Sequence, residues 1–407
     1  MTAHPSGSLR ILHVTPYSAE AWAYGGIPRL AATLARGLAR RGHRVTVCTT
    51  DAHDASTRLP RGENSPGLRA WPVRRTVDGV ELRVFPNVSN RLAYHFQAFL
   101  PVGLERYMHQ HAAAFDVAHL HACRNLPGVI AARHLGQRRV PYVLAPNGTA
   151  PRIERFRWLK GVFDGVLGQR VIDRADRVLA VSRIEQQQLT SLGIAEKCIA
   201  LIPNPIDLDE FSTPVARGRF RTRHSLAARR VVLFLGKLTA RKRVDILIRA
   251  FAQIRTSDSH LVIAGNDMGS RASNEALAST LGVGQQTTFT GLLTGAERLE
   301  ALADADVVAY PSEHEIFGLV PLEALLSGSP VIVADDCGCG EVVANLRGGQ
   351  VVPVGSVEAL AVAIRRVLEE PGSWRNRAVE SQAAIRSAYG DRAVSAELEA
   401  LYLGMVA

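Results

Sequence analysis

The stretch Val307–Leu326 reads VVAYPSEHEIFGLVPLEALL. Four apolar, strand-forming residues come first, a polar loop follows, and an apolar segment with helical spacing begins at Leu319. A short strand that passes through a loop into a helix is the repeating unit of a parallel α/β sheet. The stretch therefore predicts a loop at the carboxyl end of a strand, where sheets of this class bind their ligands.

The same alternation of strand and helix continues on both sides of this stretch. It predicts two doubly wound, parallel-sheet α/β domains, over residues 1–207 and 208–385, that face a central cleft. The other expected strands are 9–14, 44–49, 79–85, 117–121, 142–145, 177–181, 198–202, 231–236, 260–264, 286–289 and 331–334, and the main expected helices are 27–41, 128–135, 244–254 and 296–303.

Length and composition agree with two globular domains. The chain has 407 residues, which is too long for one ordinary core. With 47% hydrophobic and 21% charged residues, the composition excludes a disordered chain. Since residues 1–10 are polar and no apolar run approaches the roughly 20 residues of a membrane span, we expect a cytoplasmic protein.

The positive charge is confined to one half of the chain. Residues 1–207 hold 27 basic and 15 acidic side chains, whereas residues 208–407 hold 21 and 23. A basic excess can indicate nucleic-acid binding, but aromatic residues make up only 6% and are not interleaved with the basic ones, so we expect no nucleic-acid partner. The five cysteines do not match zinc-ligand spacings, and we expect no metal site.

Two carboxylates frame the loop that follows the strand at 307–310. Glu315 lies in the loop and Glu323 lies eight residues later, inside the helix. The backbone N–H groups of Phe317, Gly318 and Leu319 at the helix start suit an anionic or hydroxyl-rich ligand, and a carboxylate binds vicinal hydroxyls well. Alternatively, both glutamates only complement the helix dipole.

A second chemical signal follows the strand at 231–235. Gly236 and Lys237 come directly after the strand, and Lys242 precedes the next helix. Two ammonium groups at the carboxyl end of a strand would bind a diphosphate and stabilise it as a leaving group. The alternative is a solvated basic loop, and neither a P-loop nor a dinucleotide-binding glycine motif is present after a first strand.

Together these motifs resemble those of the retaining glycosyltransferases of family 4, which have the GT-B fold of two Rossmann-like domains. The pair Glu315 and Glu323 matches the family's E-x(7)-E element, and Lys237 and Lys242 match its Arg/Lys-x(4)-Lys element, with Lys where Arg is commoner. Further matches are Gly25-Gly26, Asp116 with His119-Leu120-His121, Val181-Ser182, Pro203-Asn204-Pro205-Ile206-Asp207 and Thr290-Gly291-Leu292.

The resemblance implies a role for each matched residue. Glu323 would bind the nucleotide ribose, and Glu315 would contact the donor sugar together with backbone N–H groups of Phe317, Gly318 and Leu319. Lys237 and Lys242 would bind the diphosphate after Gly236, and Gly25 and Gly26 would let backbone approach the phosphate closely. The implied reaction moves a sugar from a UDP- or GDP-activated donor to a hydroxyl of a glycan or glycolipid, without metal or other cofactor.

The resemblance also places His121 near the reacting carbon, and we expect at most one of His119 and His121 to face the site. The alternative for His121 is a structural histidine with satisfied hydrogen bonds. Because no nucleophile can be placed opposite the leaving group, we expect a front-face substitution rather than the double displacement of retaining hydrolases.

The acceptor side has weaker signals. Residues 152–167 have amphipathic helical spacing, with Arg152 and Arg155 beside an apolar face, and Asn147 precedes them. We expect either an ordinary packed helix or a surface for an anionic acceptor at the inner face of the membrane, where the protein would be peripheral. Other readings are a sugar-nucleotide 2-epimerase or phosphorylase on the same fold, and a basic nucleic-acid-binding protein.

The family resemblance further implies a hinge near Pro203–Asp207 and a last helix that crosses back to the first domain. Residues 386–403 are the expected helix, and its expected anchors are Tyr389, Ala393, Leu398 and Tyr402.

Overall fold

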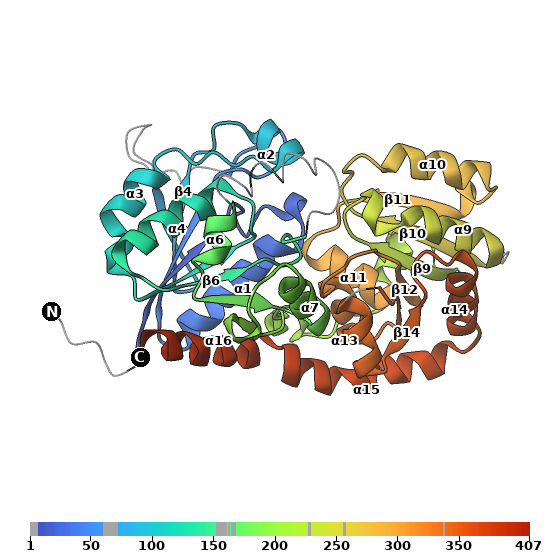
Figure 1. The fold of residues 1–407 in the computed structure, drawn as a ribbon. Coiled ribbons are helices and arrows are strands. Elements are labelled where there is room, and N and C mark those ends of the chain that lie inside the picture. The colour runs from blue at the N-terminus through green and yellow to red at the C-terminus, as the bar shows by residue number, and fades with distance from the viewer. Residues whose placement is uncertain are drawn as a thin grey trace. The chain divides into compact units, whose positions relative to one another are not determined.

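The computed structural model describes residues 7–59, 72–151, 161, 163, 168–226, 229–254, 258–336 and 338–407. The chain separates into unit 1, Met1–Pro205 with Asp391–Ala407, and unit 2, Ile206–Gly390 (Figure 1). The chain therefore changes unit at 205/206 and 390/391, where the sequence led us to expect 207/208 and 385/386. None of the helices among the described residues is long and apolar enough to cross a bilayer.

Unit 1 is built on an eight-stranded sheet in the order β3-β4-β2-β1-β5-β6-β7-β8. The central strand β1 pairs in parallel with both β2 and β5, so the direction of winding reverses between β1 and β5. Such a reversal places a crevice at the carboxyl ends of the two strands. The strands are β1 Arg10–Val14, β2 Arg44–Thr50, β3 Val73–Val77, β4 Val80–Phe85, β5 Val117–His121, β6 Tyr142–Ala145, β7 Arg177–Ala180 and β8 Ile199–Leu201.

One strand of this sheet, β3, was not predicted from the sequence. β3 pairs antiparallel with β4 through Asp78 and Gly79, and both turn residues have positive φ, 50° and 79°. An Asp-Gly pair with this backbone is the usual two-residue hairpin turn. The purely parallel sheet that we expected therefore carries one antiparallel strand at its edge.

Helices cover both faces of this sheet and bury two apolar clusters. One cluster joins the sheet to α3 and α4 and includes Leu120 and Tyr142. The other joins it to α1 and α16 and includes Leu38 and Tyr402. The helices are α1 Gly26–Arg40, α2 Asn90–Phe96, α3 Leu104–His111, α4 Leu126–Arg138, α6 Gln169–Asp173, α7 Arg183–Ser191 and α16 Asp391–Val406.

The C-terminal helix α16 returns to unit 1 but begins later than expected. The segment 386–403 is not one helix: α15 ends at Tyr389, Gly390 is extended, and α16 starts at Asp391. Leu398 and Tyr402 are fully buried in unit 1, as expected. Tyr389 is instead an anchor within unit 2, where its ring lies 5.6 Å from that of Phe317 and its carbonyl accepts a hydrogen bond from Ile206 N.

Polar contacts fix α16 against α1 and the turn that follows α1. Glu399 forms an ion pair with Arg41 and accepts a hydrogen bond at 2.8 Å from the ring of His43, whose other nitrogen accepts from Leu9 N. Gly37 of α1 lies directly under Ser395, where a Cβ would overlap the hydroxyl. Close approach of these two helices therefore depends on a glycine.

Unit 2 holds a six-stranded parallel sheet in the order β11-β10-β9-β12-β13-β14. The winding reverses between β9 and β12, which places the loops after these two strands side by side. The strands are β9 Arg230–Leu235, β10 Ser259–Ala264, β11 Thr287–Gly291, β12 Val307–Tyr310, β13 Val331–Ala334 and β14 Gly349–Val352. Of these, β14 was not predicted from the sequence.

The helices of unit 2 are α8 Arg219–Arg223, α9 Val244–Ile254, α10 Arg271–Thr280, α11 Gly295–Asp304, α12 Leu319–Leu326, α13 Gly338–Leu346, α14 Val357–Glu369 and α15 Pro371–Tyr389.

Candidate active site

Two loops of unit 2 meet at the carboxyl ends of β9 and β12. Glu313 N donates to Arg241 O at 2.9 Å, and Arg241 Nη1 donates to His314 O at 3.1 Å. Arg243 adds an ion pair with Glu313. The basic loop and the glutamate loop that the sequence singled out separately therefore form one rigid surface.

A buried ion pair joins these loops. Lys242 is only 6% exposed, and its Nζ contacts both Glu315 Oε2 and the hydroxyl of Tyr310. Tyr310 Oη also donates to Glu315 Oε2 at 3.1 Å. Burial alone would raise the pKa of Glu315, but the charges of Lys242 and Arg241 and the hydrogen bonds from Lys242 and Tyr310 lower it to about 2. The carboxylate is therefore ionised at neutral pH.

Tyr310 was not predicted as a site residue, although it is the last residue of the strand β12. Its ring stacks with that of Phe234 at a centroid distance of 5.9 Å. A Cβ on Gly236 would lie 3.3 Å from Phe234 Cζ and 3.5 Å from Tyr310 Cε2, so the glycine lets the backbone pass close to both rings. The half-buried Lys237 follows Gly236 in the same loop.

The start of α12 depends on a second glycine. Gly318 has φ 77° and precedes Leu319, the first residue of the helix. A Cβ at this position would lie 2.5 Å from Cys339 Sγ, and Cys339 N donates to Glu315 O at 3.0 Å. Phe317 is 3% exposed. The segment 317–319 is thus held in place where its backbone enters the helix, and its contact with a donor stays a prediction.

Glu323 is held by a partner that the sequence analysis did not identify. It is 1% exposed and forms an ion pair with Arg298 of α11. Arg298 is itself buried and also pairs with Glu210, which lies in a short 3₁₀ helix at Leu208–Phe211. The implied contact between Glu323 and a ribose stays a prediction.

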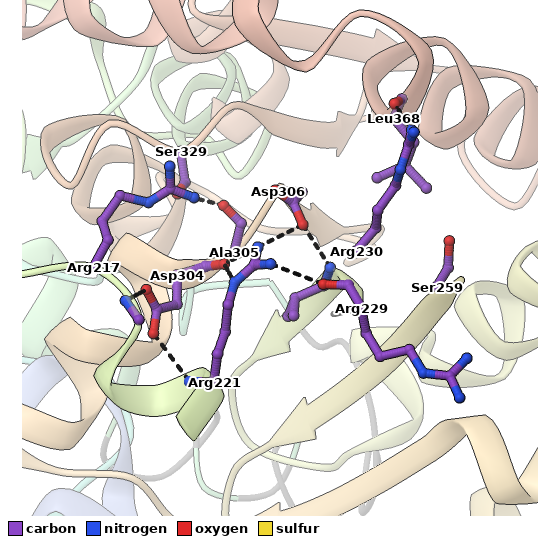
Figure 2. Close-up of polar contacts among 12 residues, drawn as sticks. Arg217, Arg221, Arg229, Arg230, Ser259, Asp304, Ala305, Asp306, Ser329 and Leu368 are labelled. Carbon is purple, nitrogen blue, oxygen red and sulfur yellow. Dashed lines mark hydrogen bonds and ion pairs between the residues drawn. The ribbon is translucent and has the colours of Figure 1, made fainter. Parts of the chain in front are cut away.

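An Asp-x-Asp sequence in unit 2, Asp304-Ala305-Asp306, has a structural role rather than a place in this site. Asp304 accepts hydrogen bonds from Gly218 N and Arg221 N. Asp306 Oδ2 accepts from Val231 N at 2.7 Å and from Arg221 Nη2 at 2.6 Å (Figure 2). These contacts lie at the amino ends of β9 and β12, on the sheet edge opposite Lys242 and Glu315.

In unit 1, three histidines gather at the carboxyl ends of β1 and β5. His13 is paired in register with His119, and the rings of His119 and His121 stack at 4.3 Å. His119 and His121 point to the same side of the sheet, because residues two apart on a strand do so. The expectation that at most one of them faces the site stays a prediction. All three are fully buried, and burial lowers their pKa values, that of His121 to about 3, so each ring is neutral.

The three histidines form a hydrogen-bonded stack. His13 Nδ1 lies 3.0 Å from His121 Nε2, and the Tyr402 hydroxyl lies 2.6 Å from His119 Nδ1. One nitrogen of each ring lies within 4.8 Å of the others, a spacing that a metal site could use. However, the ring planes are within 29° of parallel, so their lone pairs do not converge on one point as a tripod of ligands must.

The other predicted site residues of the first half lie in a turn before α1, beside a small pocket, and outside the described residues. Gly25 has φ 94° and separates the 3₁₀ turn Trp22–Tyr24 from α1, which begins at Gly26. Asn147 has φ 50° and lines a small, mostly apolar pocket of unit 1 together with His119. Arg152 and Arg155 lie outside the described residues.

Comparison with known proteins covers most of the chain. The family model described as Glycosyltransferase Family 4 matches residues 24–210, and the model described as Glycosyl transferases group 1 matches residues 219–386. The chain is 35% identical over 226 residues to the D-inositol 3-phosphate glycosyltransferase of Mycobacteroides abscessus, which covers 54% of this chain and 50% of the relative. It is 29% identical to an uncharacterized glycosyltransferase of Methanocaldococcus jannaschii over 86% of each chain.

The chain therefore spans about half the length of the mycobacterial relatives that it matches. Among solved structures, Anabaena HepE in complex with UDP and glucose aligns with a TM-score of 0.74 at 20% identity, over 98% of this chain and 100% of that one. Sucrose-phosphate synthase from Thermosynechococcus elongatus aligns with a TM-score of 0.72 at 21% identity, over 98% and 99%. These similarities confirm the expected fold class, the two parallel-sheet α/β domains of GT-B proteins.

Proposed function

Since the chain belongs to the family 4 and group 1 glycosyltransferases, we propose that it moves a sugar from a UDP- or GDP-activated donor to a hydroxyl of a glycan or glycolipid, with retention of configuration and without metal. The observation that carries the proposal is the buried cluster of Lys242, Glu315 and Tyr310 between the two loops of unit 2. The matches to two glycosyltransferase family models favour this proposal over a nucleic-acid-binding protein.

The cluster suits a donor with a diphosphate leaving group. Lys242 presents a charge that is desolvated and fixed in place, so its interaction with a developing phosphate charge is stronger than that of an exposed lysine. Glu315 stays ionised beside it and is a ready acceptor for sugar hydroxyls. Lys237, at the start of the same loop, would add a second positive charge, and Glu323 would bind the ribose.

The proposed transfer is a front-face substitution. The bond between the anomeric carbon and the phosphate oxygen breaks, and a bond to the acceptor oxygen forms on the same face. The leaving phosphate takes the proton of the acceptor hydroxyl, so atoms and charge balance without an enzyme nucleophile. His121 would orient the acceptor or a sugar hydroxyl, and Gly25 and Gly26 would let backbone approach the phosphate.

An anionic or lipid-linked acceptor is supported by unit 1. This unit carries 28 basic and 17 acidic side chains, while unit 2 carries 20 and 21. Leu92 and Phe96 lie one turn apart on α2, are 42% and 56% exposed, and flank the exposed Arg91 and His95. A basic surface with exposed apolar side chains suits a membrane face with anionic lipids. The phosphorylated acceptor named for the mycobacterial relatives points the same way.

Donor binding is tested first by thermal shift. UDP, GDP and ADP are added in turn with EDTA present, because a ligand that binds only the native state raises the melting temperature. HepE was crystallised with UDP and glucose, so we expect UDP to give the largest shift. If none of the three nucleotides shifts the transition, the proposed donor class is wrong.

Transfer is tested with UDP- and GDP-sugars, with and without EDTA, and the anomer of the product is assigned by NMR. Lys242→Met and Glu315→Gln are expected to abolish donor turnover, whereas Arg271→Met, at an exposed ion pair of α10, is the matched control that keeps it. Unchanged turnover in both site variants would show that the site is misassigned. Isotope exchange at the sugar C2 position would instead support an epimerase.

A further inference from the structure

The contact between His13 and His121 joins the two strands at which the sheet of unit 1 reverses its winding. His13 is the fourth residue of β1 and His121 is the last residue of β5. His13 Nδ1 lies 3.0 Å from His121 Nε2, and both side chains are fully buried. The resemblance assigned a role to His121 alone, and nothing in the sequence motifs involves His13.

This distance has a chemical consequence for two neutral rings. A neutral imidazole carries one N–H and one lone pair, so a 3.0 Å contact between two ring nitrogens requires a single proton between them. The contact therefore couples the two tautomers. If His121 Nε2 carries the proton, its Nδ1 is an acceptor, and if His13 Nδ1 carries it, His121 Nδ1 is a donor.

The other nitrogen of His121 is the one left for a ligand. His121 Nδ1 is buried and has no hydrogen-bond partner among the described residues. A buried polar atom of this kind costs stability unless something binds it. The ring cannot turn away to find a partner, because it is stacked 4.3 Å from His119, which the Tyr402 hydroxyl holds at 2.6 Å.

We propose that His13 is a positioning residue for His121: through its Nδ1 it fixes the ring orientation and the tautomer of His121, and so decides whether Nδ1 of His121 meets a substrate hydroxyl as donor or as acceptor. The functional part rests on the role proposed above for His121. The structural part, one fixed tautomer of His121, stands without it.

A near-isosteric pair of variants tests the structural part. The side-chain amide of His13→Asn can place a hydrogen-bonding atom close to the position of Nδ1, whereas His13→Leu has a similar volume and no such atom. ¹⁵N NMR of histidine-labelled full-length protein reports which nitrogen of His121 is protonated, and His121→Gln assigns the signals. We expect one tautomer in the parent protein and in His13→Asn, and both tautomers in His13→Leu.

Kinetics test the functional part with a UDP-sugar donor. Since a neutral hydrogen bond contributes a factor of about 2 to 13, we expect kcat to fall about tenfold in His13→Leu while KM for the donor changes less than twofold. His13→Asn should recover most of the loss. His134→Leu removes another buried imidazole of unit 1, on α4 and outside the stack, so it controls for general destabilisation and should leave kcat unchanged.

The outcomes separate the two claims. A mixture of tautomers in the parent protein, or the same single tautomer in His13→Leu, overturns the positioning role. A stoichiometric Zn²⁺ or Co²⁺ that is lost in His13→Leu also overturns it, because the nitrogens would then hold metal rather than each other. If His121→Ala keeps full transfer activity while the tautomers behave as expected, the role proposed for His121 fails and the structural claim survives.

Discussion

Breaking the buried ion pair between Lys242 and Glu315 should destabilise unit 2 far more than breaking an exposed pair. Lys242→Met keeps the length of the side chain and removes its charge. Glu315 would then keep its carboxylate, largely buried, with Tyr310 as its remaining hydrogen-bond partner in the cluster. Removing one partner of a buried pair costs more than the pair contributes, because the other charge stays desolvated.

The magnitude follows from the pKa of Glu315. The cluster lowers this pKa from 4.5 to about 2. At 1.36 kcal/mol for each pKa unit, such a shift corresponds to about 3 kcal/mol of stability at neutral pH. This value agrees with the range of about 3 to 5 kcal/mol for breaking a buried ion pair.

The same shift sets the pH dependence. A carboxylate whose pKa is lower in the folded than in the unfolded state stabilises the protein above its ordinary pKa, and this contribution is lost as pH falls through the folded value. The stability difference between the parent protein and Lys242→Met should therefore be constant near neutral pH. It should shrink as the pH falls toward about 2, starting at the higher pKa that Glu315 has in Lys242→Met, where burial still raises the pKa and Lys242 no longer lowers it.

The stability of unit 2 can be measured within the full chain by amide hydrogen exchange. Mass spectrometry then follows the exchange of peptides from β9 and β12. A double-mutant cycle with Glu315→Gln should give a coupling of at least about 2 kcal/mol, since neutralising both partners leaves no buried charge. The exposed pair Arg271–Glu275 is the control, with an expected coupling below about 0.5 kcal/mol. A loss under about 1 kcal/mol in Lys242→Met, or additive single variants, would refute the reasoning.

Three further perturbations test other parts of the fold. Arg221→Ala should cost about 3 kcal/mol in urea denaturation because it leaves the Asp306 carboxylate without its cation and the backbone carbonyls of Asp304 and Arg229 without their donors, whereas the more exposed Arg223→Ala should cost less than about 1. A chain that ends at Gly390 lacks α16 and exposes an apolar face of unit 1, a loss of about 6 kcal/mol, so a soluble and folded truncation would contradict the packing. Gly265→Ala should lower the melting temperature and weaken the UDP shift, because its Cβ would overlap the carbonyl oxygen of Gly236. Gly136→Ala, in open space on helix α4, should not lower the melting temperature and should leave the UDP shift unchanged.

Local chemistry made much of this protein readable from its sequence. The strand at 307–310, the helix at 319–326 and the loop between them were predicted because periodicity and helix-start signals depend only on neighbouring residues. The parallel pairing of β9 with β12 then brings together the loops that carry Lys242 and Glu315, which the sequence had singled out separately. The Asp78-Gly79 hairpin was equally local, and its dipeptide signal was available but not used.

What the tertiary structure alone decided is the choice of partner among residues far apart in the chain. Arg298 meets Glu323 and Glu210, His13 meets His121, and Tyr402 meets His119, over separations of 25 to 283 residues. A buried charge or imidazole ring needs a hydrogen-bond or ion-pair partner, but the sequence indicates only that such a partner must exist. Which residue satisfies it depends on strand order and helix packing, which long-range burial determines. The residues able to do chemistry were therefore visible in the sequence, and their positioning partners appeared only once the chain was folded.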